Sequence, residues 1–198
     1  TAACSAPQEA ALWLGGDIHF GPSGAETLAP LREVLGNDWG IVNLEGPISP
    51  GDTVEKNGER LILRNPERTG EELRMAGIWA AGVQNNHSLD LDTEGLQNTI
   101  MQLQTAGVLP VGNEYVALQE QAGMLIAVTA HDLSKGVPKY MKGQLESAAE
   151  KSDALVVTFH VAEESNLPSP ALEEAVEIAL AAGSRVVAVH GSHKLGAV

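Results

Sequence analysis

Residues 40–47 read Gly-Ile-Val-Asn-Leu-Glu-Gly-Pro, an apolar run that ends in a polar turn. The run 40–44 mostly lacks alternation between apolar and polar residues, which is typical of a strand covered on both faces. Gly46 and Pro47 then interrupt the chain, as expected where a strand stops. The stretch therefore predicts a buried strand with Asn43 and Glu45 at its carboxyl end.

Similar apolar runs recur along the chain and alternate with stretches of helical periodicity. Further strands are predicted at 11–14, 78–83, 108–111, 124–129, 154–159 and 185–189. Helices, with apolar residues at three- and four-residue spacing, are predicted at 26–35, 66–75, 93–106 and 169–182. This alternation predicts an α/β domain with a largely parallel sheet.

Length and composition indicate one folded domain. The chain has 198 residues, of which 43% are hydrophobic and 19% charged, which excludes a disordered chain. Domains have about 100–200 residues, so we expect a single domain. It should span residues 10–198, after a flexible segment at 1–9. Residues 47–61 lack periodicity and predict a long loop.

The charge is strongly negative, because 26 Asp and Glu residues against 12 Lys and Arg residues give −14. Nucleic acids and anionic membrane surfaces are therefore unsuitable partners, since both attract basic patches. Metal ions remain suitable partners, since carboxylates bind them. No apolar run reaches the length of about 18 residues that predicts a membrane-spanning helix.

Cys4 is the only cysteine, which excludes an intramolecular disulfide and a zinc–thiolate cluster. Residues 1–5, Thr-Ala-Ala-Cys-Ser, are similar to the end of a bacterial lipoprotein signal, although Thr1 stands where such signals usually have Leu. This similarity implies export to the bacterial cell surface or periplasm, with a lipid anchor on Cys4 as the one link to a membrane. An ordinary mobile terminus is the alternative.

Polar side chains gather at the carboxyl ends of the predicted strands, the edge where open α/β sheets bind ligands. They are Asp17, His19, Asn43, Glu45, Asn86, His87, His160, His190 and His193. Carboxylate, amide and imidazole groups without thiolate suit Mn, Fe or Zn. Two such ions about 3.5–4 Å apart can hold the attacking and leaving oxygens of phosphoryl transfer. Each residue alone could be a loop hydrogen-bonder, a helix cap or a buried histidine, but together they indicate a metal site.

Three segments carry a resemblance to a known family: Gly-Asp-Ile-His-Phe-Gly at 16–21, Val-Asn-Leu-Glu-Gly-Pro at 42–47 and Asn-Asn-His-Ser-Leu-Asp at 85–90. In this order they resemble the bacterial capsule-synthesis, or poly-γ-glutamate-synthesis, proteins of the calcineurin-like metallophosphoesterase superfamily. His160 with Glu164 resembles that family's His-Trp-Gly-x-Glu segment, and residues 182–193 resemble its segment ending in Gly-x-His-Pro-His. The resemblance covers residues 10–198 and implies an α/β/β/α sandwich.

The resemblance also implies a site for two divalent ions and a role for each matching residue. The implied metal ligands are Asp17, His19, Glu45, Asn86, His160 and His193. Glu45 would bridge the two ions, at a position where many relatives have Asp. His87, beside Asn86, would donate a proton or contact the phosphate. The implied substrate contacts are Asn43, Glu164 and His190.

The sequence departs from the family pattern near the proposed site. The family's His-Trp-Gly is His-Val-Ala at 160–162, and its His-Pro-His is Gly-Ser-His at 191–193, so one imidazole is missing. His190 would replace it only if the loop is rearranged. The chain also ends at Val198, before the Ser-Leu-Gly-Asn-Phe-like motif of the family, which predicts a carboxyl-terminal truncation.

Two functions from different classes remain open at this point. The first is a metal-dependent, phosphoesterase-like hydrolase of capsule or poly-γ-glutamate synthesis, with a small-molecule or polymer substrate. The second is a catalytically impaired scaffold or binding subunit at the cell surface, which would act with the capsule or polymer synthesis machinery in assembly or export of an anionic polymer. A plain α/β domain whose strand-end residues serve only as caps is a third interpretation.

Overall fold

The computed structural model describes residues 9–20, 28–36, 38–52, 54–58 and 60–194. The strands are β1 (Leu12–Ile18), β2 (Trp39–Leu44), β3 (Val54–Asn57), β4 (Arg60–Leu63), β5 (Ile78–Gly82), β6 (Leu109–Val111), β7 (Ala117–Gln121), β8 (Met124–Asp132), β9 (Ala154–His160) and β10 (Val186–His190). The helices are α1 (Ala29–Leu35), α2 (Thr69–Met75), α3 (Asp92–Ala106), α4 (Met141–Glu150) and α5 (Pro170–Ala181). Cys4 lies outside the described residues, as does nearly all of the segment 1–9.

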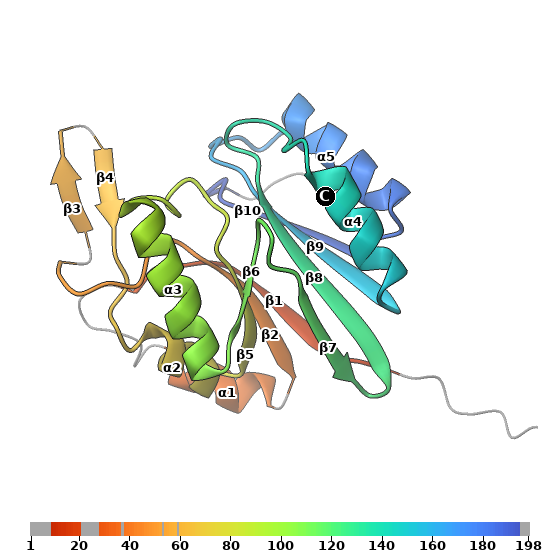
Figure 1. Ribbon diagram of the computed structural model, residues 1–198, viewed down its shortest axis with the longest axis horizontal. Coiled ribbons are helices and arrows are strands. Elements are labelled where there is room, and N and C mark those ends of the chain that lie inside the picture. Colours follow the sequence, from red (N-terminus) through yellow and green to blue (C-terminus); the bar gives the residue numbers. More distant parts are fainter. Residues whose placement is uncertain (1–8, 21–27, 37, 53, 59, 195–198) are drawn as a thin grey trace, which may run out of the picture.

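Two four-stranded sheets form the centre of the molecule (Figure 1). The first has the strand order β1-β2-β5-β6, and all its strand pairs are parallel. The second has the order β10-β9-β8-β7, in which only the pair of β7 with β8 is antiparallel. The expected α/β fold with parallel sheets is therefore confirmed.

Buried side chains cover both faces of the central strands. Ile41 belongs to a hydrophobic cluster that contains residues of both sheets, whereas its neighbour Val42 packs in a cluster with residues of α2 and α3. Val156 and Val157 are divided in the same way, between the first of these clusters and one that contains residues of α4 and α5. Successive side chains of a strand point to opposite faces, so burial on both faces explains why residues 40–44 lack alternation.

The prediction of a long loop at 47–61 was wrong in part, because this segment contains β3 and the start of β4. These two strands form an antiparallel hairpin apart from both sheets (Figure 1). All four residues of β3 are exposed, so they carry no apolar pattern that would reveal a strand. Strand β7 and helix α4 also escaped prediction, since β7 has three exposed central residues and α4 buries only three side chains.

The register of the parallel pairs brings the polar strand ends together. Asp17 of β1 lies opposite Asn43 of β2 in the first sheet, and His160 of β9 lies opposite His190 of β10 in the second. Strands β1 and β10 are in contact, although they belong to different sheets. The two pairs of polar residues therefore meet at one edge of the molecule.

The helices of the described residues all lack the combination of length and apolar composition that a membrane span requires.

His131 near the end of β8 is a completely buried imidazole in apolar surroundings. The rings of Tyr140 and Phe159 lie with their centroids 6.0 Å from its own. Within the described part of the chain, neither ring nitrogen has a hydrogen-bond partner. Burial disfavours the charged ring and lowers the pKa of His131 to about 4.

We expect His131→Phe to weaken the loss of stability at acid pH. Between pH 6.5 and about 4 the unfolded chain protonates this ring while the folded protein keeps it neutral. The free energy of unfolding therefore decreases as the pH falls through this window, by about 3 kcal/mol when the change is complete. Urea unfolding of both proteins at several pH values measures the effect. Equal pH dependence in the two proteins would contradict this account of His131.

Candidate metal centre

Three side chains from the ends of three strands converge on one point. Asp17 Oδ1 lies 2.7 Å from Nδ1 of His190 and 3.5 Å from Nδ1 of His160, and the two Nδ1 atoms are 3.2 Å apart. Ligand atoms that bind one tetrahedral Zn²⁺ lie about 3.3 Å from one another, given metal–ligand bonds of about 2.0–2.1 Å. One carboxylate and two imidazoles at this spacing could hold a metal ion.

The charge state of Asp17 suits a metal ligand. Its partial burial on its own would raise its pKa. Hydrogen bonds from His160 and His190, the positive charge of His190 and a hydrogen bond from Asn43 act in the opposite direction and hold the pKa of Asp17 well below its usual range. Asn43 Nδ2 donates to Asp17 Oδ1 over 2.8 Å. Asp17 is therefore a carboxylate at neutral pH, which is the form that binds a metal.

His160 is buried and uses both of its ring nitrogens. Nε2 lies 2.8 Å from Oδ1 of Asn86 and 3.6 Å from Oε1 of Glu45. The Asn86 oxygen is within hydrogen-bond distance and can accept a proton from Nε2. Nδ1 lies 3.4 Å from Nδ2 of Asn43 and faces Asp17 and His190. A metal ion would bind the lone pair of Nδ1 in place of the hydrogen bond to Asp17, with the ring proton left on Nε2 toward Asn86.

The buried amide of Asn85 holds Asn43 in place beside Asp17. Asn85 Nδ2 donates to Asn43 Oδ1 over 3.1 Å and to the carbonyl of Leu44 over 2.9 Å. Asn85 Oδ1 in turn accepts the backbone N–H of His87 over 3.1 Å. The sequence suggested Asn43 as a substrate contact and gave Asn85 no role. In the structure Asn43 donates to Asp17, and Asn85 orients Asn43.

His87 is held by a buried carboxylate. Its Nδ1 lies 2.7 Å from Oδ2 of Asp90, whose side chain is 1% exposed. The same oxygen accepts the backbone N–H of Leu63 over 2.8 Å. Asp90 ends the Asn-Asn-His-Ser-Leu-Asp segment, whose sequence assigned it no role. The spacing of three residues between His87 and Asp90 could have indicated this contact, because it places the carboxylate beside the imidazole across one turn of the chain.

The other implied residues lie apart from the Asp17 group. His19 Nε2 donates to the carbonyl of Arg64 over 3.2 Å, beside the β3–β4 hairpin. His193 Nδ1 lies 3.7 Å from Oε1 of Glu164, and both of these side chains are 66% exposed. The structure thus brings Asp17, His160 and His190 together and places His19, His193 and Glu164 elsewhere. His190, which the sequence suggested as a substrate contact, takes a position among the donors.

Gly191 permits this position of His190. It has φ +99°, a backbone conformation that favours glycine. A Cβ atom at this residue would overlap the carbonyl oxygen of Val161 and would lie 2.9 Å from Cε1 of His160. Gly191 stands where the family's His-Pro-His segment has its first His. Because it has no Cβ, the chain after β10 can lie close to the chain after β9 at the site.

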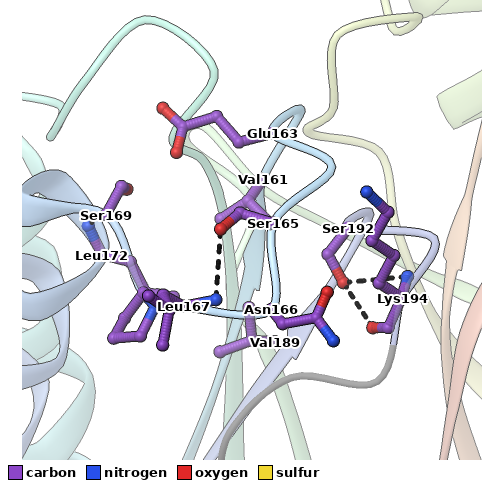
Figure 2. A pocket seen from close by; sticks show the side chains of 11 residues that line it. Val161, Glu163, Ser165, Asn166, Leu167, Ser169, Leu172, Val189, Ser192 and Lys194 are labelled. Atoms are coloured by element: carbon purple, nitrogen blue, oxygen red, sulfur yellow. Dashed lines mark hydrogen bonds between the residues drawn. The ribbon is translucent and has the colours of Figure 1, made fainter.

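A pocket of about 280 Å³ borders the same strand ends on the opposite face of the second sheet. Val161, just after His160, and Val189, just before His190, line it, and Figure 2 shows Ser192 and Lys194 on one side. Lys194 Nζ donates to the carbonyl of Glu164 over 2.9 Å, which links the loops after β9 and β10. Because adjacent side chains of a strand point to opposite faces, this pocket does not contain the Asp17 group.

Fold and site together define a class: a parallel α/β protein with a carboxylate and two imidazoles at its strand ends that could hold a metal ion. The chain belongs to the family of the bacterial capsule synthesis protein PGA_cap, whose family model matches residues 11–198. The family expected from the sequence motifs is therefore confirmed.

The fold is similar to that of a solved structure. A crystal structure of a hypothetical protein from Thermus thermophilus matches with a TM-score of 0.56 and 15% sequence identity. The match covers 92% of this chain and 68% of that chain. At this identity the similarity concerns the fold alone. No curated protein matches the chain.

We expect Gly191→Ala to destabilise the protein and to weaken metal binding at the Asp17 group. The positive φ alone costs an alanine about 1–3 kcal/mol, and the overlap with Val161 would displace His160. Urea unfolding and calorimetric titration with Mn²⁺ or Zn²⁺ measure the two effects.

Gly143→Ala is the matched control, because, apart from its chain neighbours and the local helix backbone, no atom of the described residues lies within 4 Å of an added Cβ in this helical position. It should stabilise α4 by up to about 1 kcal/mol and leave metal binding unchanged. If Gly191→Ala behaved like Gly143→Ala, the explanation of the His190 position would be wrong.

Proposed function

We propose that this protein is a metal-dependent hydrolase that cleaves a phosphoester-type bond in capsule or poly-γ-glutamate synthesis. The observation that carries the proposal is the convergence of Asp17, His160 and His190 at the carboxyl ends of parallel strands. Membership of the capsule synthesis family supports the process. The three hydrophobic clusters support a metallophosphoesterase-like α/β/β/α sandwich.

The donors present would suit two divalent ions, Mn, Fe or Zn. Asp17, His190 and Nδ1 of His160 would hold the first. Asn86 and Glu45, which lie within 3.6 Å of Nε2 of His160, are the candidates for a second. Bound divalent ions would polarise the scissile group and stabilise the charge that develops on its oxygens.

His87 is the proposed acid that protonates the leaving oxygen. Its side chain is 21% exposed and can therefore reach a substrate. With the Nδ1 proton donated to Asp90, Nε2 is the nitrogen that exchanges a proton with the substrate. Asp90 fixes this tautomer and the ring orientation, which makes it a positioning residue.

A second candidate is a binding subunit or scaffold at the cell surface for assembly or export of an anionic polymer. The positions of His19 and His193 favour it, because neither joins the three donors of the Asp17 group. Under this proposal the group would bind an ion for structural purposes. The location would follow from residues 1–5, through the similarity to a lipoprotein signal.

Metal-dependent turnover separates the two candidates. Protein purified without chelator should contain bound Mn, Fe or Zn and should hydrolyse an aryl phosphate when the metal is added. Asp17→Asn and His160→Ala should each lose metal affinity and turnover by about 100-fold or more. Elemental mass spectrometry and a colorimetric phosphatase assay give the values.

His193→Ala is the control, because this side chain is mostly exposed and lies outside the group. It should retain the metal of the Asp17 group. Bound metal without turnover would favour the scaffold, and a protein with neither metal nor turnover would contradict the hydrolase.

Asp90→Asn tests the positioning role. We expect kcat to fall by about 100-fold or more with little change in KM, because the misplaced acid acts only in the transition state. Asp153→Asn is the matched control, since Asp153 also accepts a backbone N–H, that of Leu125, over 2.8 Å, in a hydrogen bond that involves no histidine. A parallel loss of kcat in both variants would argue against a specific action on His87.

A further inference from the structure

A cavity of about 340 Å³ lies at the edge of the first sheet where its parallel strands begin. Its walls include Arg32, Trp39, Arg74, Trp79 and Gln119. We propose that this cavity is a second binding site, which takes the oxyanion group, carboxylate or phosphate, of a small ligand or polymer unit. The inference is independent of the proposed hydrolase.

The cavity is remote from the candidate metal centre. Trp39 is the first residue of β2, whereas Asn43 near the end of the same strand contacts Asp17. The four residue steps between them span about 13 Å, at a rise of about 3.3 Å per residue. The two sites therefore lie at opposite ends of one strand, and a ligand at one need not contact the other.

Two guanidinium groups line the cavity in a chain whose net charge is −14. Arg32 comes from α1 and Arg74 from the last turn of α2, at the same end of the molecule (Figure 1). Of the described residues that line the cavity, none is an Asp or Glu. Arg binds carboxylate and phosphate through paired hydrogen bonds, for which its planar fork is suited.

Two glycines leave room for these arginines. A Cβ atom on Gly77 would lie 2.5 Å from Nη1 of Arg32, and a Cβ atom on Gly107 would lie 3.6 Å from Nε of Arg74. Gly77 has φ +85° and Gly107 has φ +80°, so the turns that follow α2 and α3 themselves require glycine. The backbone at both helix ends thus lets the guanidinium groups lie close against the cavity wall.

Two indoles supply a rigid apolar wall beside the cationic groups. Trp39 and Trp79 stack with their centroids 5.2 Å apart and their planes at 29°. Trp79 is 9% exposed and packs in the hydrophobic cluster shared by the two sheets. Gln119 of β7 adds an amide from the second sheet. This combination suits an anion attached to a short apolar or planar body, since the indole faces can pack against that body.

Tryptophan fluorescence measures binding directly, because two of the three tryptophans line the cavity. The probes are inorganic phosphate and a short γ-linked glutamate oligomer, each titrated at constant ionic strength. We expect a saturable change with at least one probe. Arg32→Gln and Arg74→Gln should each weaken binding about tenfold or more, the usual effect of losing a charge-assisted hydrogen bond.

Arg68→Gln is the matched control, since this arginine is 74% exposed, pairs with Glu72 and lies outside the cavity. It should bind like the wild type, and thermal unfolding should show that all three variants are folded. Saturation by phosphate alone would assign a phosphate ligand, and saturation by the glutamate oligomer alone a carboxylate ligand. A flat titration with both probes, or binding that persists in both cavity variants, would overturn the proposal.

Discussion

The carboxylate of Asp17 is the contact on which the arrangement of the site depends. It lies at the end of β1 and accepts a hydrogen bond from Asn43 of the first sheet, while His160 and His190 approach it from the second. Without this carboxylate, Asn43 of the first sheet and His190 of the second would lose their common hydrogen-bond acceptor. An unpaired buried polar group lowers the stability of the folded protein. One partly buried charge thus joins the two sheets and supplies the carboxylate of a group that could hold a metal ion.

Further hydrogen bonds extend this arrangement to the protruding hairpin. Asn85 connects Asn43 to His87, and Asp90 connects His87 to the backbone of Leu63. Buried Asn65 donates to the carbonyls of Glu45 and Gly46 and accepts from the backbone of Phe20. A two-stranded hairpin is marginally stable alone, so the contacts of its β4 end with site residues help to hold it in place. The position of the hairpin is therefore coupled to the site.

The distribution of charge gives the two edges of the first sheet different chemistry. At the carboxyl ends of its strands, Asp17 and Glu45 lie near imidazoles, which suits a cation. At the amino ends, Arg32 and Arg74 lie beside stacked indoles, which suits an anion. Net charge alone described neither edge. It predicts that nucleic acid is not a partner, but the local placement of a few residues decides which ligands fit.

The sequence by itself determined the alternation of strands and helices, the family, and the presence of Asp17, Asn43 and His160 at strand ends, because apolar runs and the polar residues that end them are local features. Tertiary structure decided which histidines meet. His19 contacts Arg64, 45 residues away, and His190 reaches Asp17 only because Gly191 allows a tight approach to Val161. The hairpin could not be predicted from the sequence, because its strand β3 is exposed and has no apolar pattern. The arginine cavity could not be predicted either, because its lining residues come from several elements. Side-chain direction and long-range contact depend on the packed backbone, which local pattern does not encode.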